Sequence, residues 1–134
     1  AGAKYIFLKT GAYRPVDLAR AIAFASKYNL DLLTVDAAGG GTGMSPWRMM
    51  NEWGVPPVEL HSLVYQYAQK LADKKKYLPS IAVNGGFTFE DQIFKALAMG
   101  APYVKMVGMA RAPIAAAMVG KTIGQTIESQ QIPV

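Results

Sequence analysis

A glycine-rich stretch between polar residues is the part of this chain whose residue types could form a binding site. The stretch reads Asp36-Ala37-Ala38-Gly39-Gly40-Gly41-Thr42-Gly43-Met44-Ser45-Pro46. It follows an apolar run at residues 30–35 that predicts a buried strand. Glycines just past a strand let backbone N–H groups come close to a ligand, so the stretch predicts a site lined by main chain. A flexible connector is the alternative that a glycine cluster alone leaves open.

Three more apolar runs end in similar glycine turns, at Gly11, Gly85 and Gly108. In a sheet of parallel strands, ligands sit at the carboxyl ends of the strands. Four glycine turns at equivalent positions therefore predict a ligand that is cradled mostly by backbone. Gly85 and Gly86 with residues 108–111 suit a phosphate, to which Arg111 can add a positive charge. A surface arginine at a helix start explains Arg111 equally well.

The elements that must position these turns alternate along the chain. We expect strands at residues 4–9, 31–36, 79–84 and 102–107, and helices that begin at Pro15, Glu59, Thr88 and about residue 112. Thr88 with Asp91 resembles a capping box for the third of these helices. Four strand–helix units in a row predict an α/β fold with parallel strands and right-handed crossovers.

A long loop at residues 38–57 separates the second strand from the second helix, and it holds both tryptophans, Trp47 and Trp53. A loop of this length in a compact domain is usually functional, as a lid or the wall of a site. The tryptophans can pin the loop to the core, stack on a ligand, or do both. The one histidine, His61, lies in the first turn of a helix and is expected to be a packing residue rather than a catalyst.

Composition limits the possible classes of protein. The 134 residues predict one domain, and 51% hydrophobic with 17% charged residues excludes disorder. No apolar run reaches the roughly 20 residues of a membrane span. The net charge of +5 is scattered, and Lys74 to Lys76 suit a helix end better than a nucleic-acid surface. We therefore expect a soluble protein that binds neither nucleic acid nor membrane. The chain has no cysteine for disulfides or metal ligands, which is compatible with the cytoplasmic setting that we expect.

The glycine stretch also resembles a family signature. Residues 40–46, GGTGMSP, resemble the GGTGxSP signature of the FMN-binding synthase domain of glutamate synthases. Residues 45–54, SPWRMMNEWG, are similar to the shorter glutamate synthase-like proteins of archaea and bacteria. In the same order, Lys9 closes a strand, Asn84-Gly85-Gly86 stands where the family has Asp-Gly-Gly, and Gly100-Ala101 precedes the last strand. The resemblance covers essentially the whole chain.

The resemblance implies an FMN-dependent oxidoreductase domain, a (β/α)₈ TIM barrel, of which residues 1–134 supply strands five to eight. The family reaction reduces 2-iminoglutarate, made from 2-oxoglutarate and ammonia, to glutamate by way of FMN. The resemblance implies a catalytic role for Lys9, near the pyrimidine edge of the flavin. The implied FMN-binding residues are Lys9, Gly40, Gly41, Thr42, Asn84, Gly85, Gly86, Gly108, Met109 and Arg111, and the implied substrate or lid residues are Ser45, Trp47 and Arg48.

Three departures from the family pattern limit this expectation. The chain has no cysteine, so it carries neither iron–sulfur ligands nor a nucleophile for glutamine hydrolysis. Asn84 stands in place of an acidic residue. Four βα units cannot close an eight-stranded barrel. We therefore expect a half-barrel completed by a second copy or by a chain that supplies the other half, with a flattened open sheet as the third possibility. A non-catalytic half-barrel that holds a phosphate ligand, or only assembles, is the alternative function.

Overall fold

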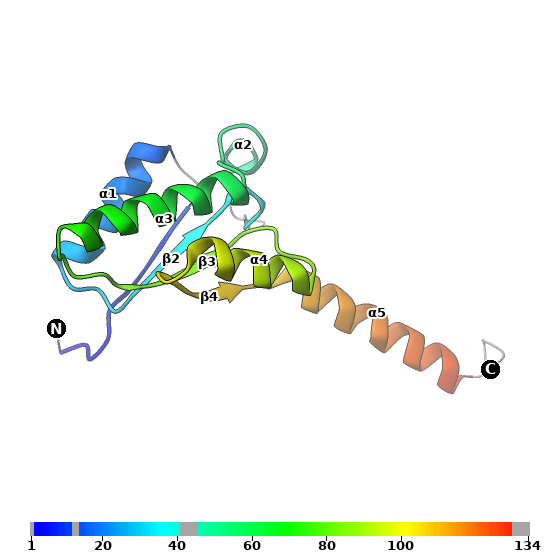
Figure 1. Cartoon of the computed structure of the whole chain (residues 1–134). Helices are drawn as coiled ribbons and strands as arrows, with labels where there is room; N and C mark the ends of the chain where they lie inside the picture. The colour runs from blue at the N-terminus through cyan, green and yellow to red at the C-terminus, as the bar shows by residue number, and fades with distance from the viewer. Residues whose placement is uncertain (1, 12–13, 41–45, 130–134) are drawn as a thin grey trace.

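The computed structural model describes residues 2–11, 14–40 and 46–129, which form a four-stranded sheet with helices between its strands (Figure 1). The elements are β1 (Phe7–Thr10), α1 (Pro15–Lys27), β2 (Leu32–Asp36), the 3₁₀ turn η1 (Ala38–Gly40), α2 (Trp47–Asn51), α3 (Pro57–Asp73), β3 (Ser80–Asn84), α4 (Glu90–Gly100), β4 (Val104–Gly108) and α5 (Arg111–Glu128).

All four strands are parallel and lie side by side in chain order, β1-β2-β3-β4. The predicted alternation of strands and helices is therefore confirmed. β1 begins at Phe7 rather than at residue 4, because pairing with β2 starts at the Phe7–Leu32 partners. Ahead of it, the Ile6 N–H donates to the Asp31 carboxylate at 2.8 Å. In β4 the register shifts between Val104 and Met106, which leaves Lys105 as the extra residue of a bulge.

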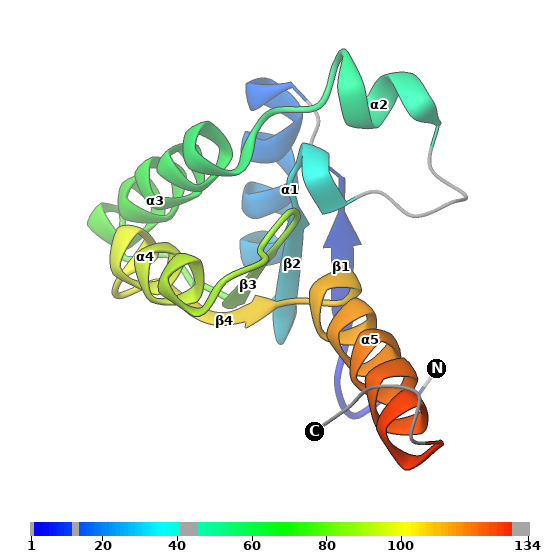
Figure 2. The same cartoon turned by 90° about the vertical axis from the view of Figure 1, so that its right-hand side faces the viewer.

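The core lies on one face of the sheet. α1, α3 and α4 cover this face, as Figure 2 shows, and they meet the buried side chains of the strands. In β2 and β3 every second residue, including Leu33 and Ile81, points into this core and is fully buried. The helices contribute apolar stripes with helical spacing, for which Leu60, Val64 and Ala68 of α3 are typical.

The opposite face of the sheet carries no helix among the described residues. Phe7 lies on it with 65% of its surface exposed, and Met106 of β4 is also exposed. α5 leaves the end of β4 and runs clear of the other elements (Figure 1), and none of its residues is buried. Its exposed apolar residues are Ile114, Met118, Val119, Ile123 and Ile127. The sheet therefore has one closed face and one open face that exposes apolar residues.

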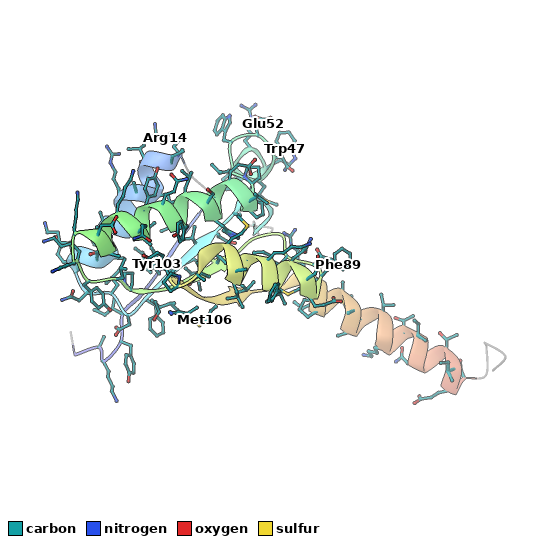
Figure 3. The ribbon with its side chains drawn as sticks, in the orientation of Figure 1. Arg14, Trp47, Glu52, Phe89, Tyr103 and Met106 are labelled. Carbon is teal, nitrogen blue, oxygen red and sulfur yellow. The ribbon has the colours of Figure 1, made fainter. Side chains whose placement is uncertain are left out.

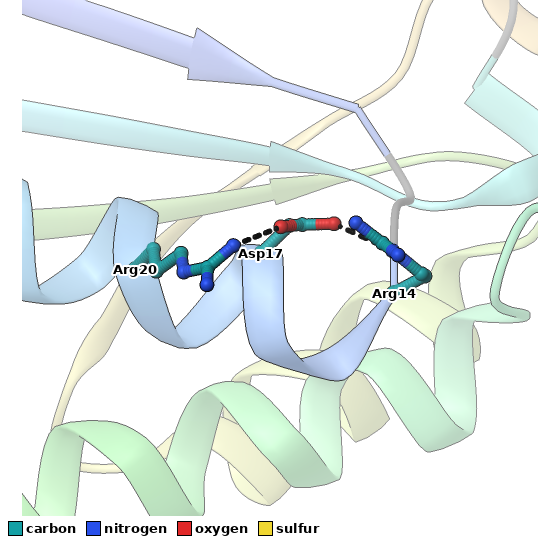
Figure 4. A network of polar contacts seen from close by, with 3 residues as sticks. All are labelled: Arg14, Asp17 and Arg20. Atoms are coloured by element: carbon teal, nitrogen blue, oxygen red, sulfur yellow. Dashed lines mark hydrogen bonds and ion pairs between the residues drawn. The ribbon is translucent and has the colours of Figure 1, made fainter.

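Local signals account for both ends of α1. α1 begins at Pro15, and Asp17 in its first turn bonds both Arg14 and Arg20 (Figure 4), which holds the pKa of the Asp17 carboxyl below its ordinary value. Asn29 ends the α1 region at φ 51°, as predicted.

The prediction that Thr88 and Asp91 form the capping box of α4 is wrong. Gln92 accepts the Thr88 and Phe89 N–H groups at 2.7 and 3.1 Å instead. The long loop also differs from an irregular connection, because η1 and α2 form within it.

Candidate functional site

A cavity of about 780 Å³ lies at the carboxyl ends of the strands. Each strand contributes one lining residue, in chain order Lys9, Asp36, Asn84 and Gly108. The loops after β2, β3 and β4 and the first turns of α5 supply the rest of the lining, namely Gly39, Gly40, Gly85, Gly86, Phe87, Thr88, Met109, Ala110, Arg111, Ala112 and Ala115. This is the edge at which parallel α/β folds bind ligands.

Strand register brings the polar side chains together on the open face. Asp36 pairs with Asn84, and Asn84 pairs with Gly108, so these three residues lie at one level. Lys9 pairs with Thr34, two residues before Asp36, and therefore points to the same face. The Lys9 ammonium lies 2.9 Å from Asp36 Oδ2. The only ion pair that the described residues form inside the cavity thus joins neighbouring strands.

Glycines at the strand ends make room for these side chains. A Cβ on Gly108 would overlap the Asn84 amide, and a Cβ on Gly40 would overlap the Asp36 carboxylate. Gly85 is restricted twice, because its φ of +111° disfavours other residues and a Cβ there would lie 2.6 Å from the Ala37 nitrogen. Close packing around the site therefore requires these glycines, and the alternative of a flexible connector does not explain them.

The end of the cavity next to α5 has the features of an anion site. Gly85 and Gly86 have φ of +111° and +90°. Outside the strand ladder, neither of their N–H groups donates to a backbone carbonyl of the described residues. α5 begins here, and a helix N-terminus favours negative charge. The Arg111 guanidinium donates to the Gly39 carbonyl, which ties the start of α5 to the loop after β2.

Comparison with known families agrees with this geometry. The family described as the conserved region in glutamate synthase matches residues 1–120. The chain belongs to the glutamate synthase family. No curated protein matches it.

Most of the residues that the sequence assigned to the glutamate synthase site line this one cavity. They are Lys9, Gly40, Asn84, Gly85, Gly86, Gly108, Met109 and Arg111. Their roles toward a ligand stay predictions. Gly41, Thr42 and Ser45 lie outside the described residues. Of the four glycine turns, the one at Gly11 does not line the cavity.

Trp47 and Arg48 do not line the cavity either. They belong to α2, where Trp47 and Glu52 project from the upper end of the molecule in Figure 3. Arg48 lies 4.0 Å from the Glu52 carboxylate and 6.0 Å from the centre of the Trp53 ring. The structure therefore places these two residues on an exposed helix beside the site, and their predicted role toward a substrate stays a prediction.

Sequence reasoning missed Asp36 as a site residue, although it opens the glycine stretch. The alternation of side chains along the strand could have indicated this role. Asp36 lies two residues after Thr34 and therefore on the same face of the strand, whereas the other face is apolar. Phe87 and Thr88 were missed as well, since neither carries a motif. Their place in the lining follows from the path of the chain after Gly86.

His61 does not line the cavity and lies in the core. Its side chain is 2% exposed, and its ring stacks on Phe87 with 5.5 Å between centroids. Burial lowers the pKa of His61 to about 4, and its Nε2 has no hydrogen-bond partner among the described residues. The burial of His61 and its stacking on Phe87 support the predicted packing role. The described residues contain no cluster of three or more metal-ligating side chains, and none of their helices is long and apolar enough to span a membrane.

Proposed function

We propose that this chain is an FMN-binding module of glutamate synthase type, which takes part in the reduction of 2-iminoglutarate to glutamate when its barrel is complete. One observation carries the proposal. Glycine turns, a lysine and an arginine from separate βα units converge on a single cavity at the carboxyl edge of the sheet. Membership of the glutamate synthase family supports a flavin as the ligand.

The residues present fit an FMN group. A cavity of about 780 Å³ is within the usual range for cofactors, about 300 to 1,000 Å³. One end offers backbone N–H groups, a helix N-terminus and Arg111, which suit a phosphate. The other end offers the Lys9 ammonium, which suits a ring that becomes negatively charged on reduction. Between these ends, Gly40 and Gly108 leave room for the polar side chains of Asp36 and Asn84.

When bound, FMN supplies the two-electron chemistry of the reaction. The chain's own residues do the remaining work. Lys9 stabilises negative charge at the pyrimidine edge, while Gly85, Gly86, Gly108 and Arg111 hold the phosphate end. Asn84 replaces the acidic residue of the family pattern, and its amide offers both a donor and an acceptor to the ring or substrate.

We further infer that the sheet is the second half of a (β/α)₈ barrel. Sequential parallel strands with their crossover helices on one face are the arrangement of such a barrel. Four strands leave two unpaired edges and an apolar inner face, so the site needs a second half. A second copy of the chain is the favoured occupant, and a chain that supplies strands one to four is the other.

The proposal is tested by reconstitution with FMN. Purified protein is incubated with FMN and dialysed, and the visible absorption spectrum is recorded. Retained flavin absorption, with binding lost in Gly85→Ala, supports the cofactor site. Colourless protein that takes up no FMN contradicts it.

The unpaired edges and exposed α5 favour the alternative of a non-catalytic assembly module. Formation of glutamate from 2-oxoglutarate and ammonia with reduced FMN separates the enzyme from that alternative.

A further inference from the structure

We propose that Asp36 is a positioning residue for Lys9, which holds the ammonium at the carboxyl edge of the sheet and offsets its charge toward the bound flavin. This inference rests on the proposed function, because it concerns the same cavity. It assigns a role to a residue that the resemblance to glutamate synthases did not single out.

The geometry of the pair supports a holding role. Lys9 is the last inward-facing residue of β1, and its side chain is 57% exposed, so little else restricts its four-carbon chain. Asp36 ends β2, and its side chain is only 13% exposed. The Asp36 carboxylate is therefore the fixed member of the pair. At 2.9 Å it keeps the mobile ammonium on the inner face, where a ligand at the strand ends would meet it.

The surroundings of Asp36 are unfavourable for a residue with only a structural role. Its Oδ1 atom is buried and has no hydrogen-bond partner among the described residues. The absence of a side chain at Gly40 is what leaves room for that oxygen. A buried carboxylate oxygen without a donor weakens a fold. Groups that cost stability are typical of functional sites, where they serve a ligand rather than the fold.

The charge of the pair has a consequence for the flavin. Lys9 alone would place a full positive charge beside the ring, whereas the Lys9–Asp36 pair is neutral overall. A positive charge near the ring favours reduced over oxidised FMN, so Asp36 moderates that preference. The pair thus sets the reduction potential through the balance between two side chains on neighbouring strands.

Redox titration of the FMN-loaded full chain tests this balance. Asp36→Asn leaves the positive charge alone and is expected to raise the midpoint potential. A tenfold increase in the ratio of the affinities for reduced and oxidised FMN corresponds to a rise of about 30 mV for a two-electron couple. Lys9→Met is expected to shift the potential by a similar amount in the opposite direction. The double variant Lys9→Met/Asp36→Asn is expected to lie near wild type, because the charges are removed together.

Two outcomes of the titration overturn the inference. An unchanged potential in Asp36→Asn means that the carboxylate does not act on the flavin. A fall in potential like that of Lys9→Met means that Asp36 holds the lysine in place without offsetting its charge toward the flavin, which overturns the proposed charge balance. Asp91→Asn is the matched control, because Asp91 forms an exposed ion pair with Lys95 on α4, at 2.6 Å and away from the cavity. This control is expected to leave the potential unchanged.

A second measurement needs no flavin and separates this inference from the proposed function. The wild-type protein without FMN is treated with acetic anhydride, and the labelling rates of Lys9 and Lys95 are followed by peptide mass spectrometry. Loss of its carboxylate partner frees the amine, so Lys9 is expected to be labelled several-fold faster in Asp36→Asn, and Lys95 only in Asp91→Asn. Equal Lys9 labelling in wild type and Asp36→Asn contradicts the holding role. Wild-type protein that retains no FMN contradicts the proposed function, together with the effect on potential.

Discussion

At the scale of residues, three polar groups in sparsely bonded surroundings set the properties of this chain. Asp36 and Lys9 face each other at the strand ends. His61 lies in the core, where Nε2 has no partner among the described residues. Buried polar atoms without partners, such as Asp36 Oδ1 and His61 Nε2, cost folding free energy. The proposed role of the ion pair is measured by the flavin potential, and the effect of His61 by the dependence of stability on pH.

The stability of the protein should fall between pH 6.5 and pH 4 because of His61. Its pKa is about 4 in the folded chain and about 6.5 when unfolded. In this window the unfolded state binds more protons, so the free energy of unfolding decreases by up to about 1.4 kcal/mol per unit as the pH falls. Above pH 6.5 the contribution is complete. Urea unfolding of wild type and His61→Leu at several pH values measures the difference in slope. Equal slopes would contradict the prediction.

At the scale of elements, the helices differ in what holds them. α1, α3 and α4 are held by the core, and α4 has an additional local signal at its start, because Gln92 accepts two N–H groups. α5 has no buried residue, and Gly120 and Gly124 in its middle lower its intrinsic helix propensity. α5 therefore depends on packing against a partner more than α1, α3 and α4 do.

Removal of the Gln92 cap should destabilise α4. Gln92→Ala leaves the Thr88 and Phe89 N–H groups without an acceptor, and a loss of about 1 kcal/mol in the free energy of unfolding is expected. Gln92→Glu keeps the acceptor and adds negative charge to the first turn, so it should retain the wild-type stability. Chemical denaturation compares the three proteins. A neutral Gln92→Ala, or a Gln92→Glu that is equally destabilised, would show that the cap contributes nothing.

At the scale of the whole molecule, the apolar residues divide into a buried core and an open face. Two sheet edges, the inner face of the sheet and the stripe along α5 are left without a partner among the described residues. Exposed apolar surface of this kind marks an association site. Pairing of β1 with β4 of a second copy, twice, would close an eight-stranded barrel and complete the cavity.

We expect the protein to be a dimer or larger in solution. Phe7 lies on the open face and is 65% exposed, so Phe7→Lys should shift the mass toward the monomer. Phe94 on α4 is 74% exposed and lies on a helix that faces away from the open face, so Phe94→Lys should leave the mass unchanged. Light scattering over a range of concentrations measures both. A monodisperse wild-type monomer, or equal effects of the two variants, would rule out this mode of assembly.

The sequence by itself determined the order and type of the elements. Each strand, and each helix apart from η1 and α2, arises from a local pattern, such as the stripe of Leu60 and Val64 or the apolar run that ends at Val35. The structure moves the ends of these elements by only a few residues. The glycine signature determined the family, since its residues lie next to one another in the chain. It also pointed to most of the cavity lining, because the carboxyl ends of parallel strands share one edge.

Only the tertiary structure decided which side chains meet. Asp36 reaches Lys9 because of the register between β1 and β2, and a shift of one residue would send the carboxylate to the other face. The Gln92 cap and the burial of His61 against Phe87 likewise depend on how the chain turns after β3. These contacts join segments far apart in the sequence or compete with equally plausible local alternatives. Local periodicity carries no information about them, because it reports only which face of an element is apolar.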